Sequence, residues 1–116
     1  MESAVPLEAS TADAAALVGH PRITGSDVLL LDCREPDEHA TARIEGATLI
    51  PMREIPERLA ELEPWRNKPI VVHCHHGMRS MRVAQFLRDS GFARAQSMRG
   101  GIEAWSLEID PGVPRY

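Results

Sequence analysis

One short segment of the sequence, HCHHGMRS at residues 73–80, contains residue types and a spacing that could do chemistry. Cys74 directly follows a predicted strand, Arg79 comes after four intervening residues, and Gly77 is one of those four. Glycine permits backbone angles with which a short loop can turn its N–H groups inward around a sulfur atom. Those N–H groups, the Arg79 guanidinium and the N-terminus of a following helix would all favour the thiolate, the nucleophilic form of cysteine. The segment therefore predicts a reactive cysteine in an anion-binding loop.

Short apolar runs alternate with helical patterns along the chain, and these elements must position the loop. The predicted strands cover residues 28–31, 48–50, 69–73 and 94–98. The first predicted helix is capped at Thr11 and closed by Gly19, and a loop and a short helix are expected to follow the strand that ends in the charged segment 32–39. A surface helix is predicted through residues 54–62, another from Ser80 to Gly91, and a short one after Gly100-Gly101. The tail DPGVPRY is too rich in proline for regular structure.

This order of elements predicts an α/β fold. Strands that are apolar throughout and alternate with helices form parallel sheets covered on both faces, because parallel strands need crossover connections. Ligands in such sheets bind beyond the carboxyl ends of the strands. Cys74 follows the run PIVVH at that end of a predicted strand.

Length, charge and cysteine content limit the class of protein. A chain of 116 residues predicts a single domain over residues 1–116. The net charge of −4 gives no basic field for nucleic acid or an anionic membrane, so neither partner is expected. The N-terminus MESAVPLEAS lacks the features of a signal peptide and no apolar run reaches membrane length, so we expect a cytoplasmic protein. Two cysteines cannot form a disulfide framework, and the sequence defines no oligomeric state.

Three segments together resemble the rhodanese family. CHHGMRS is similar to the family's six-residue active loop, which corresponds here to Cys74–Arg79. LLLDCREPDEH followed by ARIEGATLIP is similar to the first signature region, and MRGGIEAW is similar to the closing one. The resemblance implies a rhodanese-like domain with a mainly parallel, roughly five-stranded sheet and helices on both faces. It also implies transfer of a sulfane sulfur from a donor such as thiosulfate or a persulfide to a thiol, cyanide or protein acceptor, through a persulfide on Cys74.

The candidate site follows from the loop and this resemblance. The candidate catalytic residue is Cys74, and neither a cofactor nor a metal is expected. The candidate substrate-binding residues are His75, His76, Gly77, Met78, Arg79 and Ser80. His75 and His76 stand where well-studied thiosulfate-using members often have a basic residue, so strong thiosulfate affinity is not expected. Anion binding, proton transfer and a solvated loop position all stay open for these two histidines.

Other polar residues near the loop have structural interpretations. Cys33 follows a buried run, and we interpret it as a small core residue rather than a resolving thiol. Asp32 and Arg34 are expected to position neighbouring loops through hydrogen bonds. A zinc site at residues 73–76 is not expected, since successive residues at a strand end point to opposite faces.

Two other functions compete with sulfur transfer. Cysteine phosphatases place five residues between the cysteine and the arginine, whereas Cys74 and Arg79 have four between them. The shorter loop fits a sulfur atom better than a tetrahedral phosphoryl group. A non-catalytic binding or regulatory module of the same fold is the second alternative, and the presence of Cys74 argues against it.

Overall fold

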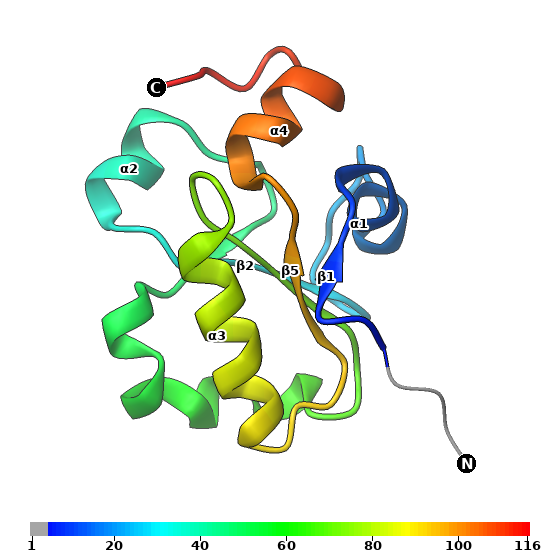
Figure 1. Ribbon diagram of the computed structural model, residues 1–116, viewed down its shortest axis with the longest axis vertical. Coiled ribbons are helices and arrows are strands. Elements are labelled where there is room, and N and C mark those ends of the chain that lie inside the picture. The colour runs from blue at the N-terminus through cyan, green and yellow to red at the C-terminus, as the bar shows by residue number, and fades with distance from the viewer. Residues whose placement is uncertain (1–4) are drawn as a thin grey trace.

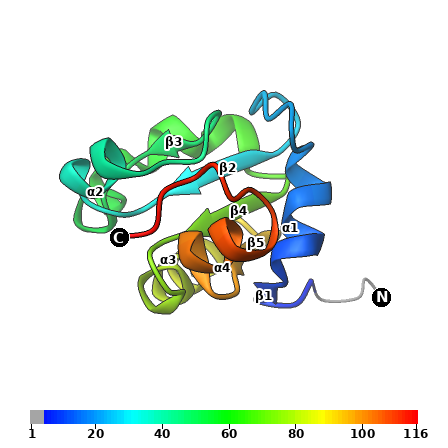
Figure 2. The same cartoon turned by 90° about the horizontal axis from the view of Figure 1, so that it is seen from above.

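The central element of the fold is one sheet of five strands. The computed structural model describes residues 5–116, so residues 1–4 of the segment MESAVPLEAS lie outside the described part. The strands are β1 (Glu8–Ala9), β2 (Leu29–Asp32), β3 (Thr48–Leu49), β4 (Ile70–His73) and β5 (Ala95–Met98). They lie in the order β1-β5-β4-β2-β3, and every pair is parallel (Figures 1 and 2). The predicted α/β class is confirmed, and all carboxyl ends meet at one edge.

The sheet is covered on both faces, as its apolar strands predict. On one face α3 (Met78–Asp89) and the 3-10 segments η1 (Met52–Glu54) and η2 (Pro56–Trp65) lie over the strands, and on the other lie α1 (Thr11–Val18) and α4 (Gly101–Glu108). The side chains of β2 alternate between the two cores, with Leu29 and Leu31 in one and Leu30 in the other. In the described part of the chain, the one helix that covers neither face, α2 (Pro36–Thr41), buries no residue and lies near the carboxyl edge of the sheet (Figure 1).

The strand β1 is the element that the sequence did not predict. It has only two residues, and the carbonyls of Leu7, just before it, and of Ala9, within it, accept hydrogen bonds from the backbone N–H groups of Ser97 and Arg99. Such a short segment has no periodicity of its own. Its strand conformation comes from pairing with β5.

Two predicted helix starts are displaced. Ser10, not Thr11, is the N-cap of α1, because its hydroxyl accepts the backbone N–H of Asp13. The helix predicted to begin at Ser80 begins at Met78, after Gly77 with a φ of 112°. Gly77 in the left-handed region turns the chain sharply enough to start the helix early. Ser80 therefore lies within the first turn of α3, where its N–H group has no helical partner.

The surface helix predicted over residues 54–62 is not an α-helix. The chain forms η1 and η2, and Arg58 inside η2 has non-helical angles of φ −114° and ψ 16°. Pro56 and Pro64 carry no N–H donor, and the Arg58 N–H bonds to Ile55 O with i→i+3 spacing. The predicted apolar face is nonetheless correct at Leu62, which is buried.

After α4 the chain has no regular structure, as predicted, and it crosses the carboxyl edge of the sheet toward α2 (Figures 1 and 2). This path brings the last residues over the loop that follows β4. Among residues 5–116, no helix is both long and apolar enough to span a bilayer.

Candidate active site

The sulfur of Cys74 lies at the centre of the loop between β4 and α3. The side chain is almost fully buried, with 1% of its surface exposed. The backbone N–H groups of Gly77 and Ser80 point at Sγ over 3.0 and 3.4 Å. Both groups stand at the start of α3, where helix N–H groups lack partners in the helix. The loop thus surrounds Cys74 with donors that stabilise negative charge on sulfur.

Ser80 adds a hydroxyl to this arrangement. The Cys74 thiol donates to Ser80 Oγ over 3.4 Å, and Ser80 Oγ also lies 3.2 Å from the carbonyl of Gly77 and 2.7 Å from Ser97 Oγ. Ser80 and Ser97 are fully buried. A hydroxyl rotates to suit its partners, so when Ser97 donates to Ser80, Ser80 can turn its own proton toward a sulfur anion.

The N-terminus of α4 supports the loop from behind. The N–H groups of Ile102 and Glu103 donate to the carbonyls of Cys74 and His75 over 2.8 and 3.2 Å. A Cβ at Gly101 would lie 2.4 Å from His75 O and 2.5 Å from Cys74 O, so only glycine allows this approach. Because α4 binds the loop carbonyls, the N–H groups of the loop are free to face the sulfur.

Arg79 forms an ion pair with Glu38 of α2. Its two terminal nitrogens donate to the two carboxylate oxygens over 2.7 and 2.9 Å. The hydrogen bonds from Arg79 lower the pKa of Glu38 to about 2, and Glu38 raises the pKa of Arg79. Both groups therefore stay charged, and together they carry no net charge. The sequence predicts that the positive charge of Arg79 favours the Cys74 thiolate, and the structure gives that charge a carboxylate partner.

The two loop histidines form an aromatic stack. The His75 ring lies 3.9 Å from the His76 ring and 4.0 Å from the Tyr116 ring, centroid to centroid, with interplanar angles of 24° and 7°. Burial and then the charge of His76 lower the pKa of His75. His75 is therefore held between two rings and is only partly exposed, whereas His76 is exposed and Met78 is 77% exposed.

The pair Asp32 and Arg34 is buried and joins several segments. Arg34 donates twice to Asp32, over 2.9 and 2.8 Å, and also to the carbonyl of Ala42 over 2.6 Å. Burial alone would raise the pKa of Asp32, but the hydrogen bonds from Arg34 outweigh it, and the pKa is lowered to about 2. The pair positions the segment around α2, in keeping with the predicted structural role.

Cys33 lies in the same core cluster as Cys74 and is fully buried. Burial raises the pKa of its thiol well above the ordinary range, and the negative charges of Cys74 and Asp32 raise it further. A thiol that stays protonated is a poor nucleophile. The environment of Cys33 is thus that of the small core residue predicted for it.

Sequence reasoning missed three residues that contact the loop: Glu38, Ser97 and Tyr116. The sequence does contain a pattern that points to Glu38: it stands three residues after Glu35, which is the spacing of a capping box at a helix start. The structure contains that capping box. Ser97 lies in the predicted strand 94–98, which is too short and too mixed in polarity for the sequence to show which face Ser97 occupies. Tyr116 lies in a segment without periodicity.

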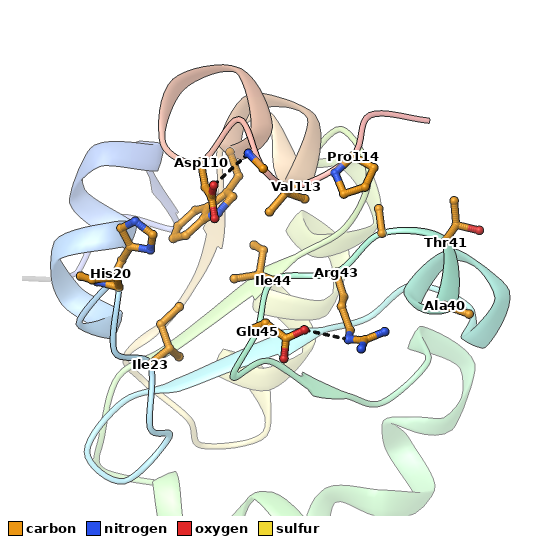
Figure 3. Close-up of a pocket in the computed structure, with 14 residues that line it drawn as sticks. His20, Ile23, Ala40, Thr41, Arg43, Ile44, Glu45, Asp110, Val113 and Pro114 are labelled. Carbon is orange, nitrogen blue, oxygen red and sulfur yellow. Dashed lines mark hydrogen bonds and ion pairs between the residues drawn. The ribbon is translucent and has the colours of Figure 1, made fainter.

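A separate hollow of about 420 Å³ lies between the segments that follow α1, α2 and α4. Figure 3 shows His20 on one side of it, Thr41 on the opposite side and Val113 above. Two of its charged groups, Arg43 and Glu45, are paired with each other. Within the described residues, no member of the cysteine loop lines this hollow. The sulfur site and the hollow are therefore distinct.

Comparison with known proteins identifies the family. The model of the family described as "Rhodanese-like domain" matches residues 11–108. The "Sulfurtransferase" of Allochromatium vinosum is 39% identical over 80 residues, which cover 69% of this chain and 73% of that protein. The "Thiosulfate sulfurtransferase GlpE" of Pseudoalteromonas translucida is 33% identical over 89 residues, which cover 77% and 83% of the two chains. The chain belongs to the rhodanese-like domain family.

The likeness extends to structure. The crystal structure of a rhodanese-related protein from Thermoplasma volcanium matches with a TM-score of 0.77 at 30% identity, over 96% of this chain and 100% of that one. Longer proteins also match, and the chain spans 30% of the length of the "Rhodanese-like/PpiC domain-containing protein 12, chloroplastic" of Arabidopsis thaliana. The predicted class, a rhodanese-type sulfurtransferase, is confirmed.

Proposed function

We propose that Cys74 is the sulfur carrier of this sulfurtransferase. In the first step its thiolate attacks the outer sulfur of a donor, the donor's S–S bond breaks, and a persulfide forms on Cys74. With thiosulfate the leaving group is sulfite, which takes the electron pair of the broken bond. In the second step an acceptor thiolate or cyanide attacks the outer sulfur, and the Cys74 thiolate departs.

One observation carries this proposal: the N–H groups of Gly77 and Ser80 converge on Cys74 Sγ at 3.0 and 3.4 Å. A thiolate nucleophile, a persulfide and a departing thiolate are all anions at this position. Preorganised donors stabilise each of them without having to reorient during the reaction. The hydroxyl of Ser80 is placed to add a third donor.

The pairing of Arg79 with Glu38 bears on the donor. A carboxylate beside the arginine offsets the positive charge that would attract a dianion such as thiosulfate. We therefore propose that a persulfide, as a small molecule or on a protein, is the better donor and that thiosulfate is used more weakly. His75, His76, Gly77, Met78, Arg79 and Ser80 remain the proposed substrate-binding residues, and Met78 among them is 77% exposed.

We further propose that residues 1–116 act as one domain and that the protein works in the cytoplasm. Both cysteines are free thiols, and a reducing compartment keeps thiols in that state. A thiol or protein acceptor would be available there.

The test is the intact mass of the protein after incubation with thiosulfate or with a small-molecule persulfide. The parent and Cys33→Ser should gain the mass of one sulfur atom, and cyanide or a dithiol should remove it. Cys74→Ser should gain nothing, because a hydroxyl is far less ionised and a poorer nucleophile toward sulfur. A sulfur that maps to Cys33, or that persists in Cys74→Ser, contradicts the assignment. A parent that never gains sulfur from either donor favours the non-catalytic module.

A further inference from the structure

Tyr116 contacts the cysteine loop and two ion pairs at once. Its hydroxyl accepts a hydrogen bond from Arg34 over 2.8 Å and donates one to Glu38 Oε2 over 2.8 Å. Arg34 is the partner of Asp32 in the core, and Glu38 is the partner of Arg79 in the loop. The hydroxyl thus closes a continuous chain of hydrogen bonds from β2 to the start of α3.

The ring of Tyr116 makes a second, independent contact. It lies parallel to the His75 ring, with centroids 4.0 Å apart and an angle of 7° between the planes. Since His76 lies against His75 at 3.9 Å and two rings cannot share one face at such distances, His75 lies between Tyr116 and His76. The chain after α4 runs toward α2, as Figure 2 shows, and the stacking distance places the Tyr116 ring against His75.

These contacts assign Tyr116 a part in sulfur transfer, on the premise that Cys74 is the sulfur carrier. We propose that Tyr116 is a positioning residue: its ring orients His75, and its hydroxyl orients Glu38 and, through Glu38, Arg79. Stacked rings and a shared hydroxyl fix side chains that would otherwise sample several rotamers. The loop is thereby held in one arrangement before a donor arrives.

The stack also limits the contact of the His75 ring with water, since the residue is only partly exposed. Its Nε2 atom is buried and has no hydrogen-bond partner. The charged and titratable groups that face it are His76 in the loop, Glu38 from α2, Glu103 from α4 and the backbone of Tyr116. Burial has the largest effect and disfavours the imidazolium. Loss of the Tyr116 ring would hydrate His75, so the pKa of His75 should rise toward its ordinary value.

Three variants of the full chain separate the two contacts. Tyr116→Phe keeps the ring and removes the hydroxyl, Tyr116→Ala removes both, and Leu107→Ala changes a side chain that is 59% exposed on α4 and serves as the control. Each variant is measured for its unfolding midpoint, for the pKa of His75 by NMR titration of the ring, and for kcat and KM with thiosulfate and cyanide.

With Tyr116→Ala we expect a higher pKa of His75 and a fall in kcat/KM of about tenfold, from loss of loop order. With Tyr116→Phe we expect the parent pKa of His75 and a fall of about threefold, mainly through KM, since Glu38, which holds Arg79, loses its hydroxyl partner. Leu107→Ala should match the parent in all three measurements.

Two results would overturn the proposal. One is a folded Tyr116→Ala protein whose His75 pKa and kinetics equal those of the parent. The other applies where Tyr116→Ala does not fold: Tyr116→Phe kinetics equal to the parent then show that the hydroxyl positions nothing. The NMR titration of His75 does not depend on catalysis. If Cys74 carried no sulfur, the proposed function would be overturned, but the effect of Tyr116 on the pKa of His75 could still be measured.

Discussion

Glu38 and Arg79 stand 41 positions apart in the sequence and meet through two hydrogen bonds, of 2.7 and 2.9 Å, at the edge of the cysteine loop. One comes from a helix that buries no residue, and the other from the first turn of the helix beside Cys74. The carboxylate cancels much of the charge that the loop sequence offers to an anion. The electrostatics of the site therefore depend on α2 as much as on the loop itself.

Removing the carboxylate charge should improve the use of an anionic donor. Glu38→Gln keeps the shape of the side chain and frees the charge of Arg79, so kcat/KM for thiosulfate should rise several-fold, to about tenfold at most. Arg79→Ala should lower it by about tenfold or more, because Glu38 then faces the donor unpaired. Steady-state kinetics with thiosulfate and with an uncharged persulfide donor check both variants, and the uncharged donor should show the smaller changes. A Glu38→Gln protein with poorer thiosulfate kinetics would show that the pair matters through geometry rather than charge.

The hydroxyl of Ser80 should speed persulfide formation. Ser80→Ala keeps the backbone N–H at 3.4 Å from Cys74 Sγ but removes the third donor, and we expect the rate of persulfide formation to fall by about tenfold. Ser97→Ala removes only the partner that frees the Ser80 proton, so its effect should be smaller and in the same direction. Single-turnover mass measurements give both rates. The idea fails if Ser97→Ala slows the step more than Ser80→Ala does.

His73 should make the fold sensitive to mild acid. It is fully buried, and neither ring nitrogen has a hydrogen-bond partner. Burial lowers the pKa of His73 from 6.5 to about 4, so between these values the unfolded chain binds a proton that the folded chain does not. Above pH 6.5 His73 is neutral in both the folded and the unfolded chain, and its burial does not make stability depend on pH. As the pH falls from 6.5 toward 4, the free energy of unfolding decreases by up to about 1.4 kcal/mol per pH unit, because only the unfolded chain gains the proton.

Urea unfolding at pH 7.5 and pH 4.5 tests this for the parent and for His73→Leu, which has a side chain of similar size and no polar atom. The variant should lose less stability than the parent between the two pH values. The depressed pKa of Asp32, about 2, acts only below its ordinary value of 3.8 and so lies outside this window. Equal losses in parent and variant would assign the acid sensitivity to another group.

No Cys74-dependent phosphatase activity is expected. The N–H groups of Gly77 and Ser80 converge on the sulfur itself, and only four residues lie between Cys74 and Arg79. The guanidinium that would bind a phosphoryl group is occupied by Glu38. An assay with an aryl phosphate, comparing the parent with Cys74→Ser, should show no difference in phosphate release. Release that depends on Cys74 would refute the argument from loop length.

The sequence predicted most of the fold because local patterns define it. The apolar runs at residues 29–31 and 70–72 lie within β2 and β4, and their sequence alone predicts that both faces of these strands are buried. The errors have local physical causes. Because Pro56 and Pro64 donate no backbone hydrogen bond, the segment forms 3-10 turns where an α-helix was predicted. Because Gly77 adopts a left-handed conformation, α3 begins at Met78, two residues before the predicted start at Ser80. The two-residue β1 has no pattern and depends on β5.

The sequence by itself determined the α/β class, the position of Cys74 after the strand β4 and the loop whose N–H groups surround it, since each depends on residues adjacent in the chain. Only the tertiary structure decided which side chains complete the site. Glu38, Ser97 and Tyr116 reach the loop from α2, from β5 and from the segment after α4. Contacts between residues so far apart in sequence leave no periodicity or spacing to recognise. They arise because parallel strands bring all their carboxyl ends, and the segments that follow them, to one edge of the sheet.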